Sequence, residues 1–220
     1  MTGTLKTTLI QNPSSADVNI TLGTSGEVTL AKSPVLNGST SGTLTIAAPA
    51  VAGTNTQTLV AATGTLAPLI SGTSQASTSG TSIDFTSIPS WVKRITVMFS
   101  GVSVSGTSSF LIQIGPSAAV ETTGYISTSI VTGAGTAQIS STAGFVIYQD
   151  AAAEINSGLA TIINMTANSW VFSHAGKNNT VKGSFGGGDK TVASTLARVR
   201  ITTVNGTDTF DAGTINIMYE

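Results

Sequence analysis

Residues that commonly carry enzyme chemistry are few in this chain. His174 is the only histidine, and the sequence has ten acidic residues, nine basic residues and no cysteine. A Ser-His-Asp triad would have to use His174 with a serine and an aspartate from distant strands, and residues 173–176 contain no nucleophile elbow. We expect His174 on an exposed loop that follows a strand containing Trp170 and Phe172. The sequence therefore predicts no catalytic residue and no enzyme.

Two pairs of carboxylates are close in sequence. Asp150 and Glu154 are one helical turn apart, and Asp208 and Asp211 lie in a turn before the last predicted strand. Paired carboxylates can cleave glycosidic bonds, and three or more can bind calcium, which Asp208, Asp211 and Glu220 would achieve only through folding or contact between chains. Aspartates before a strand more commonly accept backbone hydrogen bonds in a turn. We therefore predict no metal site and no cofactor.

A glycine run at residues 186–188, followed by Asp189 and Lys190, superficially resembles a phosphate-binding loop. It lacks the GxxxxGK[ST] spacing and no helix pattern follows it. The sequence instead predicts a flexible hairpin tip at this position.

Three residues are candidates for contact with a receptor: Tyr125, Trp170 and His174. The faces of tyrosine and tryptophan rings pack well on pyranose rings, so Tyr125 and Trp170 are suited to stacking on a sugar. Burial in a core is the alternative for both, because large aromatic side chains supply much of a core's apolar area. For Trp91, which follows Pro89 and Ser90, we expect a role as a core or interface plug.

The overall composition excludes several classes of protein. Charged residues make up 9% of the 220 residues, against roughly 25% in an average soluble domain. Nine basic residues are too few for a nucleic-acid-binding stripe, and no apolar run is long enough to cross a membrane. The mean hydropathy of +0.30 disfavours charged disorder. Threonine, serine, glycine, alanine, valine and isoleucine predominate, which predicts an all-β fold. The N-terminus lacks a secretory signal pattern, so if the protein works outside a bacterium we expect release by lysis rather than by secretion.

Residues 1–70 contain no aromatic residue and only four charges. Short apolar-Thr-apolar triplets recur at residues 20–22, 28–30 and 44–46, with glycine and asparagine between them. Units of this size cannot bury their own apolar face, so they must stack on neighbours or on other chains. We predict a repetitive β-stem here, with an irregular, extended β segment packed on a partner as the alternative.

A Ser/Thr/Gly stretch at residues 71–80 is typical of a linker or of a solvated crossing, and all twelve aromatic residues follow it. Alternating patterns then predict strands. Ile95, Val97 and Phe99 are alternate residues that would share one face of a strand. A second strand would carry Leu159, Thr161, Ile163 and Met165 on one face. Eight or more strands with turns between them predict a β-sandwich, jelly-roll-like, over residues 81–220. A single short helix is expected near residues 150–154.

The C-terminal region resembles a β-rich domain of bacteriophage tail fibres and related virion proteins. The resemblance rests on residues 79–103, which begin SGTSIDFTSIPSWVKRITVMF, on 111–115 (LIQIG) and 121–125 (ETTGY), and on the ending 198–220. Residues 41–56 resemble, by composition, the segments that precede such domains. No catalytic residues accompany the family.

The resemblance implies a homotrimeric virion protein that is assembled in the host cytoplasm. Its N-terminal region would attach to other tail, collar or capsid proteins. Its distal β-domain would bind a bacterial surface polysaccharide or outer-membrane protein during adsorption, with no nucleic acid bound and no insertion into a membrane. Because most fibres are longer than 220 residues, a head fibre, collar or decoration protein with a purely structural role is the alternative.

Overall fold

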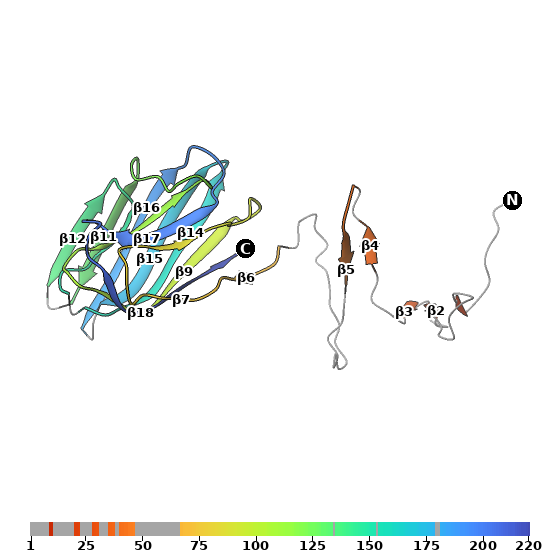
Figure 1. The fold of residues 1–220 in the computed structure, drawn as a ribbon, viewed down its shortest axis with the longest axis horizontal. Coiled ribbons are helices and arrows are strands. Elements are labelled where there is room, and N and C mark those ends of the chain that lie inside the picture. Colours follow the sequence, from red (N-terminus) through yellow and green to blue (C-terminus); the bar gives the residue numbers. More distant parts are fainter. Residues whose placement is uncertain are drawn as a thin grey trace. The chain divides into compact units, whose positions relative to one another are not determined.

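The computed structural model describes residues 9–10, 20–22, 28–30, 35–37, 40–46, 67–133, 135–152, 154–178 and 181–220. The chain divides into two compact units, Met1–Gly64 and Thr65–Glu220 (Figure 1). The described residues form strands, turns and bends without any helix, which confirms the expected all-β class. Within these ranges, no helix is long and apolar enough to cross a membrane.

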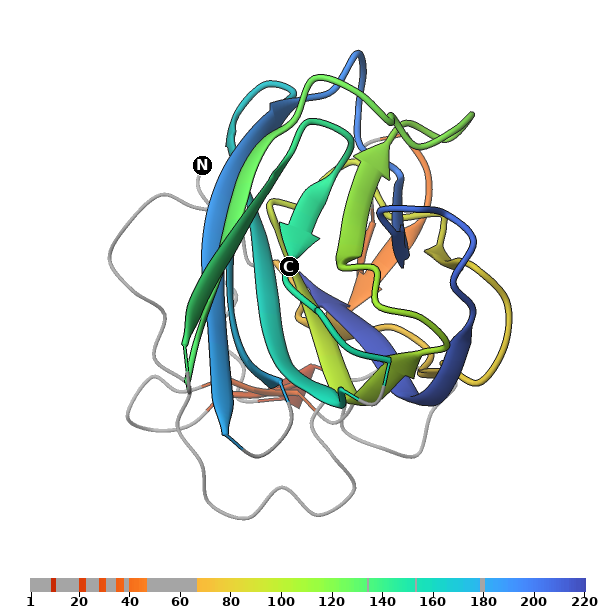
Figure 2. The ribbon, with the colours of Figure 1, turned by 90° about the vertical axis from the view of Figure 1, so that its left-hand side faces the viewer.

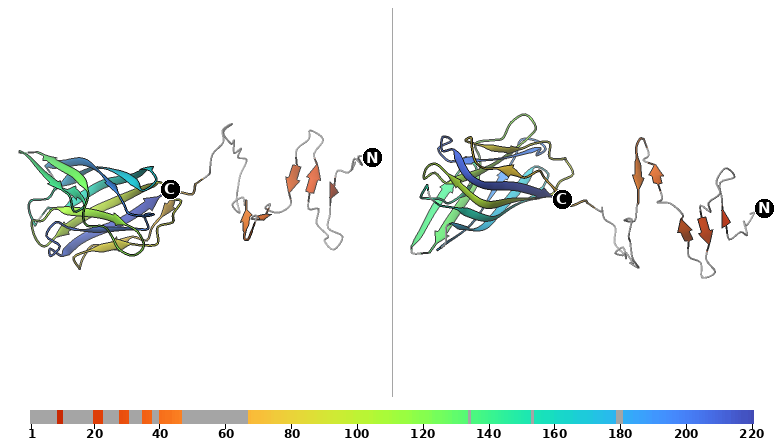
Figure 3. Two further views of the ribbon diagram at one scale, coloured as in Figure 1. Left: turned by 90° about the horizontal axis from the view of Figure 1, so that it is seen from above. Right: turned by 60° about the horizontal axis from the view of Figure 1, so that its bottom comes forward.

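The N-terminal unit contains short strands that pair with their neighbours along the chain (Figure 3). Two of the predicted triplets coincide with strands β2 and β3, and the third overlaps β5. β1, β2 and β3 form one antiparallel sheet, and β4 and β5 form a second. The bounds are β1 (Leu9–Ile10), β2 (Ile20–Leu22), β3 (Val28–Leu30), β4 (Val35–Asn37) and β5 (Thr43–Thr45). Leu30, Leu36 and Ile46 are exposed in this unit.

The larger sheet of the C-terminal unit is antiparallel and has nine strands. Its order is β12-β11-β16-β15-β14-β9-β18-β6, and β7 also pairs with β18. The bounds are β6 (Ile70–Ser71), β7 (Gln75–Ala76), β9 (Arg94–Val104), β11 (Ile126–Thr132), β12 (Thr136–Ser141), β14 (Asn156–Thr166), β15 (Ser169–Asn178), β16 (Lys182–Thr191) and β18 (Phe210–Tyr219).

A four-stranded antiparallel sheet packs on the inner face of the larger one, in the order β13-β10-β17-β8 (Figure 2). The bounds are β8 (Ile83–Phe85), β10 (Phe110–Gly115), β13 (Phe145–Ile147) and β17 (Arg198–Thr203). Side chains of both sheets form one buried cluster. Phe145 of β13 stacks on Phe172 of β15 with ring centroids 4.6 Å apart, which joins the two layers. This arrangement confirms the predicted β-sandwich.

Period-2 alternation decides which side chains reach the core. Ile95, Val97 and Phe99 of β9 are buried, as the sequence predicted. In β14 the apolar set that includes Leu159, with Ile163 and Met165, faces outward and is exposed. The alternate residues, Ala160 and Ile162, carry the core contacts instead.

Two local predictions were wrong. The glycine run at residues 186–188 lies inside β16, paired with β11 on one side and β15 on the other, and is not a hairpin tip. A Cβ at Gly186 would lie 2.3 Å from the carbonyl oxygen of Thr128, so glycine lets these strands pair closely. The described residues of the segment expected to be helical form a turn instead, and the Glu154 amide donates to the carbonyl oxygen of Ala151.

The Ser/Thr/Gly stretch at residues 71–80, expected as a linker or a solvated crossing, lies within the C-terminal unit, and most of its residues are exposed. Ser71 of β6 and the whole of β7 pair with β18 at the edge of the larger sheet. The side chain of Ser77 is fully buried, and its hydroxyl donates to the carbonyl oxygen of Ala212 at 2.8 Å. Backbone pairing, rather than apolar side chains, therefore holds this stretch on the C-terminal unit.

Candidate functional site

His174 lies in β15 on the inner face of the larger sheet and is 6% exposed. Its expected position on an exposed loop was wrong. Its Nε2 lies 3.0 Å from the Ser129 hydroxyl oxygen, which also accepts a hydrogen bond from the Tyr148 amide. Ser129 therefore has its own proton free to donate to Nε2, which suits a neutral imidazole. Burial lowers the pKa of His174 to about 4, so the ring stays neutral at pH 7.

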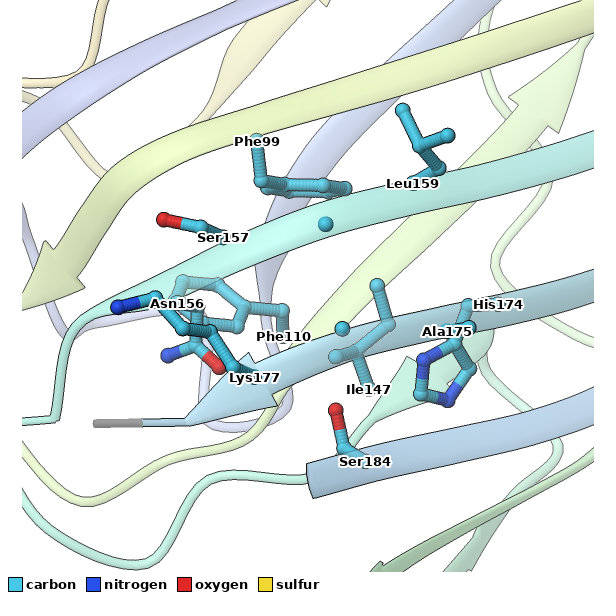
Figure 4. Close-up of a pocket in the computed structure, with 12 residues that line it drawn as sticks. Phe99, Phe110, Ile147, Asn156, Ser157, Leu159, His174, Ala175, Lys177 and Ser184 are labelled. Atoms are coloured by element: carbon cyan, nitrogen blue, oxygen red, sulfur yellow. The ribbon is translucent and has the colours of Figure 1, made fainter. Parts of the chain in front are cut away.

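The cavity beside His174 is too small for a substrate. Figure 4 shows His174 and Asn156 at opposite ends of its lining. Its volume of about 20 Å³ corresponds to room for about one water molecule. Asn156 donates to Gln149 Oε1 at 2.8 Å, while its own Oδ1 has no partner among the described residues. The pair of Ser129 and His174 is thus a buried structural contact, with no space in which a nucleophile could meet a substrate.

Tyr125 is 1% exposed and holds a loop in place. Its hydroxyl oxygen accepts a hydrogen bond from the Ile114 amide at 2.7 Å and lies 3.0 Å from the carbonyl oxygen of Glu121. Burial raises the pKa of the Tyr125 hydroxyl, so it remains protonated and able to donate. The ammonium group of Lys190 lies 5.3 Å from the centre of the ring and pairs with the Glu121 carboxylate at 2.5 Å.

Glu121 completes this attachment. Burial on its own would raise the pKa of the carboxyl, but hydrogen bonds from the Ala193 amide and from Lys190 lower it below its usual value. The carboxylate therefore stays ionised and ties the loop before β11 to the segment after β16.

None of the three proposed receptor contacts is available on the surface. Tyr125, Trp170 and His174 are all less than 10% exposed. Each occupies an inward position, because the aromatic ring or imidazole contributes to the packing between the two sheets. Burial was the alternative for the two aromatic residues, and the structure places both there. Trp91, in contrast, is 40% exposed and lies beside Tyr219, with 6.1 Å between ring centroids.

The first pair of carboxylates, Asp150 and Glu154, binds a lysine. Lys182 Nζ lies 2.7 Å from Asp150 Oδ1 and 2.7 Å from Glu154 Oε1. The hydrogen bond from Lys182 lowers the pKa of Asp150, and the same bond raises the pKa of Lys182. Glu154 is almost fully buried, so this ion pair neutralises a buried carboxylate in the turn before β14.

The second pair does not converge on a shared position. Asp208 accepts a hydrogen bond from the Ser108 amide at 3.0 Å and from Asn205 Nδ2 at 2.7 Å, and Asp211 bonds the Ser103 hydroxyl. Both aspartates therefore hold neighbouring loops and strands together. In the part of the chain that the structure describes, no three His, Asp or Glu side chains are grouped to hold a metal ion.

An exposed apolar row crosses the outer face of the larger sheet, and the sequence analysis did not find it. Strand pairing places Leu159 of β14 opposite Met98 of β9 and Ala175 of β15. On the next strand, Phe185 of β16 lies opposite Ala175. Ile130 of β11 in turn lies opposite Phe185. Leu159 is 54% and Phe185 49% exposed. The adjacent row carries only Thr161, Ser173, Gly187 and Thr128, so the centre of this face has no charge.

Comparison with protein-family models, with curated proteins and with solved structures found no match to this chain.

Proposed function

We propose that this chain is a structural protein of a bacteriophage virion, a trimeric tail fibre or similar appendage. In this proposal the N-terminal unit attaches to other virion proteins and assembles the trimer. The C-terminal sandwich contacts the bacterial surface, either a polysaccharide or an outer-membrane protein.

The observation that carries the proposal is the contrast between the two units. In the described part of the N-terminal unit, strands of two or three residues pair only locally and leave Leu30, Leu36 and Ile46 exposed. Isolated hairpins of this kind are marginally stable in water, and contact with identical segments of other chains would bury their apolar side chains. The C-terminal unit has a core of its own and does not need such contacts to fold.

The sequence resemblance supports the same assignment, because it covers the sandwich from residue 79 to the last strand. Contacts with the host would come from the exposed outer face, where Phe185 lies among threonine, serine and apolar side chains. A trimer would present three such faces, and many fibres on one particle would multiply weak contacts by avidity.

The experiment uses antibodies raised against the purified full chain. We expect immunogold labelling of an appendage on the phage particles that encode the chain, and we expect Fab fragments to reduce adsorption to the host. Labelling with unchanged adsorption would support the purely structural appendage instead. Absence of the chain from purified particles, by labelling and by mass spectrometry, would overturn the virion assignment.

A further inference from the structure

An open pocket of about 310 Å³ lies on the smaller sheet of the C-terminal unit. Strands β10 and β17 form its floor, and the segment before β8, the turn before β13 and the turn after β17 surround it. A water molecule occupies about 30 Å³ of liquid, so the pocket has room for about ten. This volume lies at the lower end of the range typical of small-molecule sites, roughly 300–1,000 Å³.

Strand register brings three polar side chains into one row across this sheet. Gln113 of β10 lies opposite Arg200 of β17, and Arg200 lies opposite Asp84 of β8. The residues next to them along the strands, such as Ile112 and Ile201, belong to the core between the two sheets. Because successive side chains of a strand point to opposite faces, the row lies on the outer face, away from the core.

Gln113 supplies an acceptor that a ligand can reach. The side chain lines the pocket and is 7% exposed. Its Nε2 group donates to the carbonyl oxygen of Ala143 at 2.9 Å, which leaves Oε1 without a donor among the described residues. Unpaired buried atoms that are closed to solvent belong, in the described part of the chain, to Asn156, Trp170, Asn178 and Arg198. Gln113 Oε1 is not one of them, so it is open to an incoming group.

Arg200 supplies donors whose positive charge is already balanced. Its Nε and Nη2 groups each donate to a carboxylate oxygen of Asp84, both at 2.9 Å. A guanidinium group has further N–H donors on Nη1, and the side chain is 34% exposed, so these donors remain available. No other charged side chain of the described residues lines the pocket. The pocket is therefore polar and close to neutral.

The remaining lining combines hydroxyl groups with small apolar side chains. The Thr202 hydroxyl donates to the carbonyl oxygen of Thr81 at 2.8 Å, which leaves its oxygen able to accept a hydrogen bond. Ala143 and Val204 add apolar surface beside it, and Val204 is 48% exposed at the rim. A ligand can thus place apolar C–H groups and polar groups in the same pocket.

We propose that this pocket binds a neutral sugar, one pyranose unit of a larger glycan, with Gln113 Oε1 as acceptor and Arg200 Nη1 as donor. A hydroxyl group both donates and accepts, so neighbouring hydroxyls of one ring can pair with both side chains. An oxyanion only accepts. It would gain little from a guanidinium group that Asp84 already neutralises, and it would lie near the amide oxygen of Gln113.

The site is separate from the exposed apolar row of the larger sheet. The inference rests on the pocket itself and does not depend on the virion assignment. Binding is measured on the purified chain, whereas the virion assignment is tested by labelling of particles, so either can fail without the other.

The test is saturation-transfer difference NMR with the full chain, which detects weak ligands of a large protein. The probes are the methyl glycosides of glucose, galactose, mannose and N-acetylglucosamine, with sodium glucuronate as the charged comparison. We expect saturable transfer to at least one neutral glycoside, and a higher Kd for glucuronate than for that glycoside.

Arg200→Lys keeps a cation beside Asp84 but removes the Nη1 donors. We expect it to raise the Kd about tenfold, as for loss of one charge-assisted hydrogen bond. Arg198→Lys is the matched control, because Arg198 lies on the same strand and the same face but does not line the pocket. Ala143→Phe is a second variant that fills the pocket from a half-buried turn position, and it should abolish the transfer. Circular dichroism checks the fold of each variant.

Three results would overturn the proposal. The first is the absence of saturable transfer to every neutral glycoside. The second is a lower Kd for glucuronate than for the neutral glycosides, which would indicate an anion site. The third is a Kd that changes equally in Arg200→Lys and Arg198→Lys, or that folded Ala143→Phe leaves unchanged.

Discussion

Replacing Tyr125 with phenylalanine should destabilise the sandwich more than the loss of one hydroxyl at the surface does. The Tyr125 hydroxyl oxygen accepts a hydrogen bond from the Ile114 amide at 2.7 Å, near the end of β10 where β13 no longer pairs with it. In Tyr125→Phe this buried amide loses its partner, which costs roughly 1–3 kcal/mol. We expect the free energy of unfolding to fall by about 2 kcal/mol, and Tm to fall by about 4–8 °C at roughly 2–4 °C per kcal/mol for a chain of this size.

The matched control is Tyr148→Phe. The Tyr148 hydroxyl donates to Asp150 Oδ2 at 3.2 Å at an exposed position, so its removal should cost less than about 0.5 kcal/mol. Urea denaturation of the wild type and both variants, followed by circular dichroism, measures the difference. Equal destabilisation by the two substitutions would show that the Tyr125 hydroxyl does not replace a strand partner for the Ile114 amide.

Three further predictions follow from side chains inside the sandwich. Gly186→Ala should lower the free energy of unfolding by about 2 kcal/mol or more, because the new Cβ would lie 2.3 Å from a backbone oxygen. The control Gly183→Ala should change the free energy of unfolding little, because the nearest atom to its Cβ would lie at 3.9 Å. Equal urea midpoints of the two variants would contradict this prediction. Lys182→Met should cost about 2–4 kcal/mol because it leaves the buried carboxylate of Glu154 without its cation, and a urea midpoint equal to that of the wild type would show that the pair is dispensable. The pKa of His174 falls from 6.5 to about 4 on folding, so the unfolded chain binds more protons between these values. As the pH falls from 6.5 to 4, the free energy of unfolding of the wild type should fall by up to about 3 kcal/mol more than that of His174→Gln. The same dependence of the free energy of unfolding on pH in both proteins would contradict this prediction.

Alternation in the sequence predicted the sandwich, and its limits explain most of the errors. A period of two identifies which residues share a face but not which face is buried, so Leu159 and its partners were grouped correctly without showing that they lie outside. Large apolar side chains therefore occur on both faces of β14. The smaller Ala160 and the β-branched Ile162 fill the inner positions.

Two strand regions, the glycine run of β16 and residues 71–76, were not predicted as strands because they are rich in glycine and serine. The glycine run in β16 has no side chains to alternate, and its conformation depends on the close approach of β11 and on His174, which only the folded arrangement provides. Residues 71–76 pair with β18 mainly through backbone groups, which composition does not reveal. The exposed position of Phe185 was not predicted for the same reason, because Phe185 stands next to this glycine run and its place on the sheet depends on long-range pairing.

The candidate sites needed three-dimensional information for a different reason. Nothing local in the sequence shows that Tyr125 reaches the Ile114 amide or that the Trp170 indole group lacks an acceptor. The sequence left two alternatives for Tyr125 and Trp170, contact with a receptor or burial in the core. Burial, which depends on the second sheet, decided between these alternatives.

The solution masses of the full chain and of residues 65–220, measured by light scattering at micromolar concentration, test whether the N-terminal unit assembles several copies of the chain. We expect about 66 kDa for the full chain, three times the 22.1 kDa of one chain. We expect the C-terminal unit alone to lose this association and to keep a folded core. A monomeric full chain would show that the N-terminal unit does not assemble a trimer.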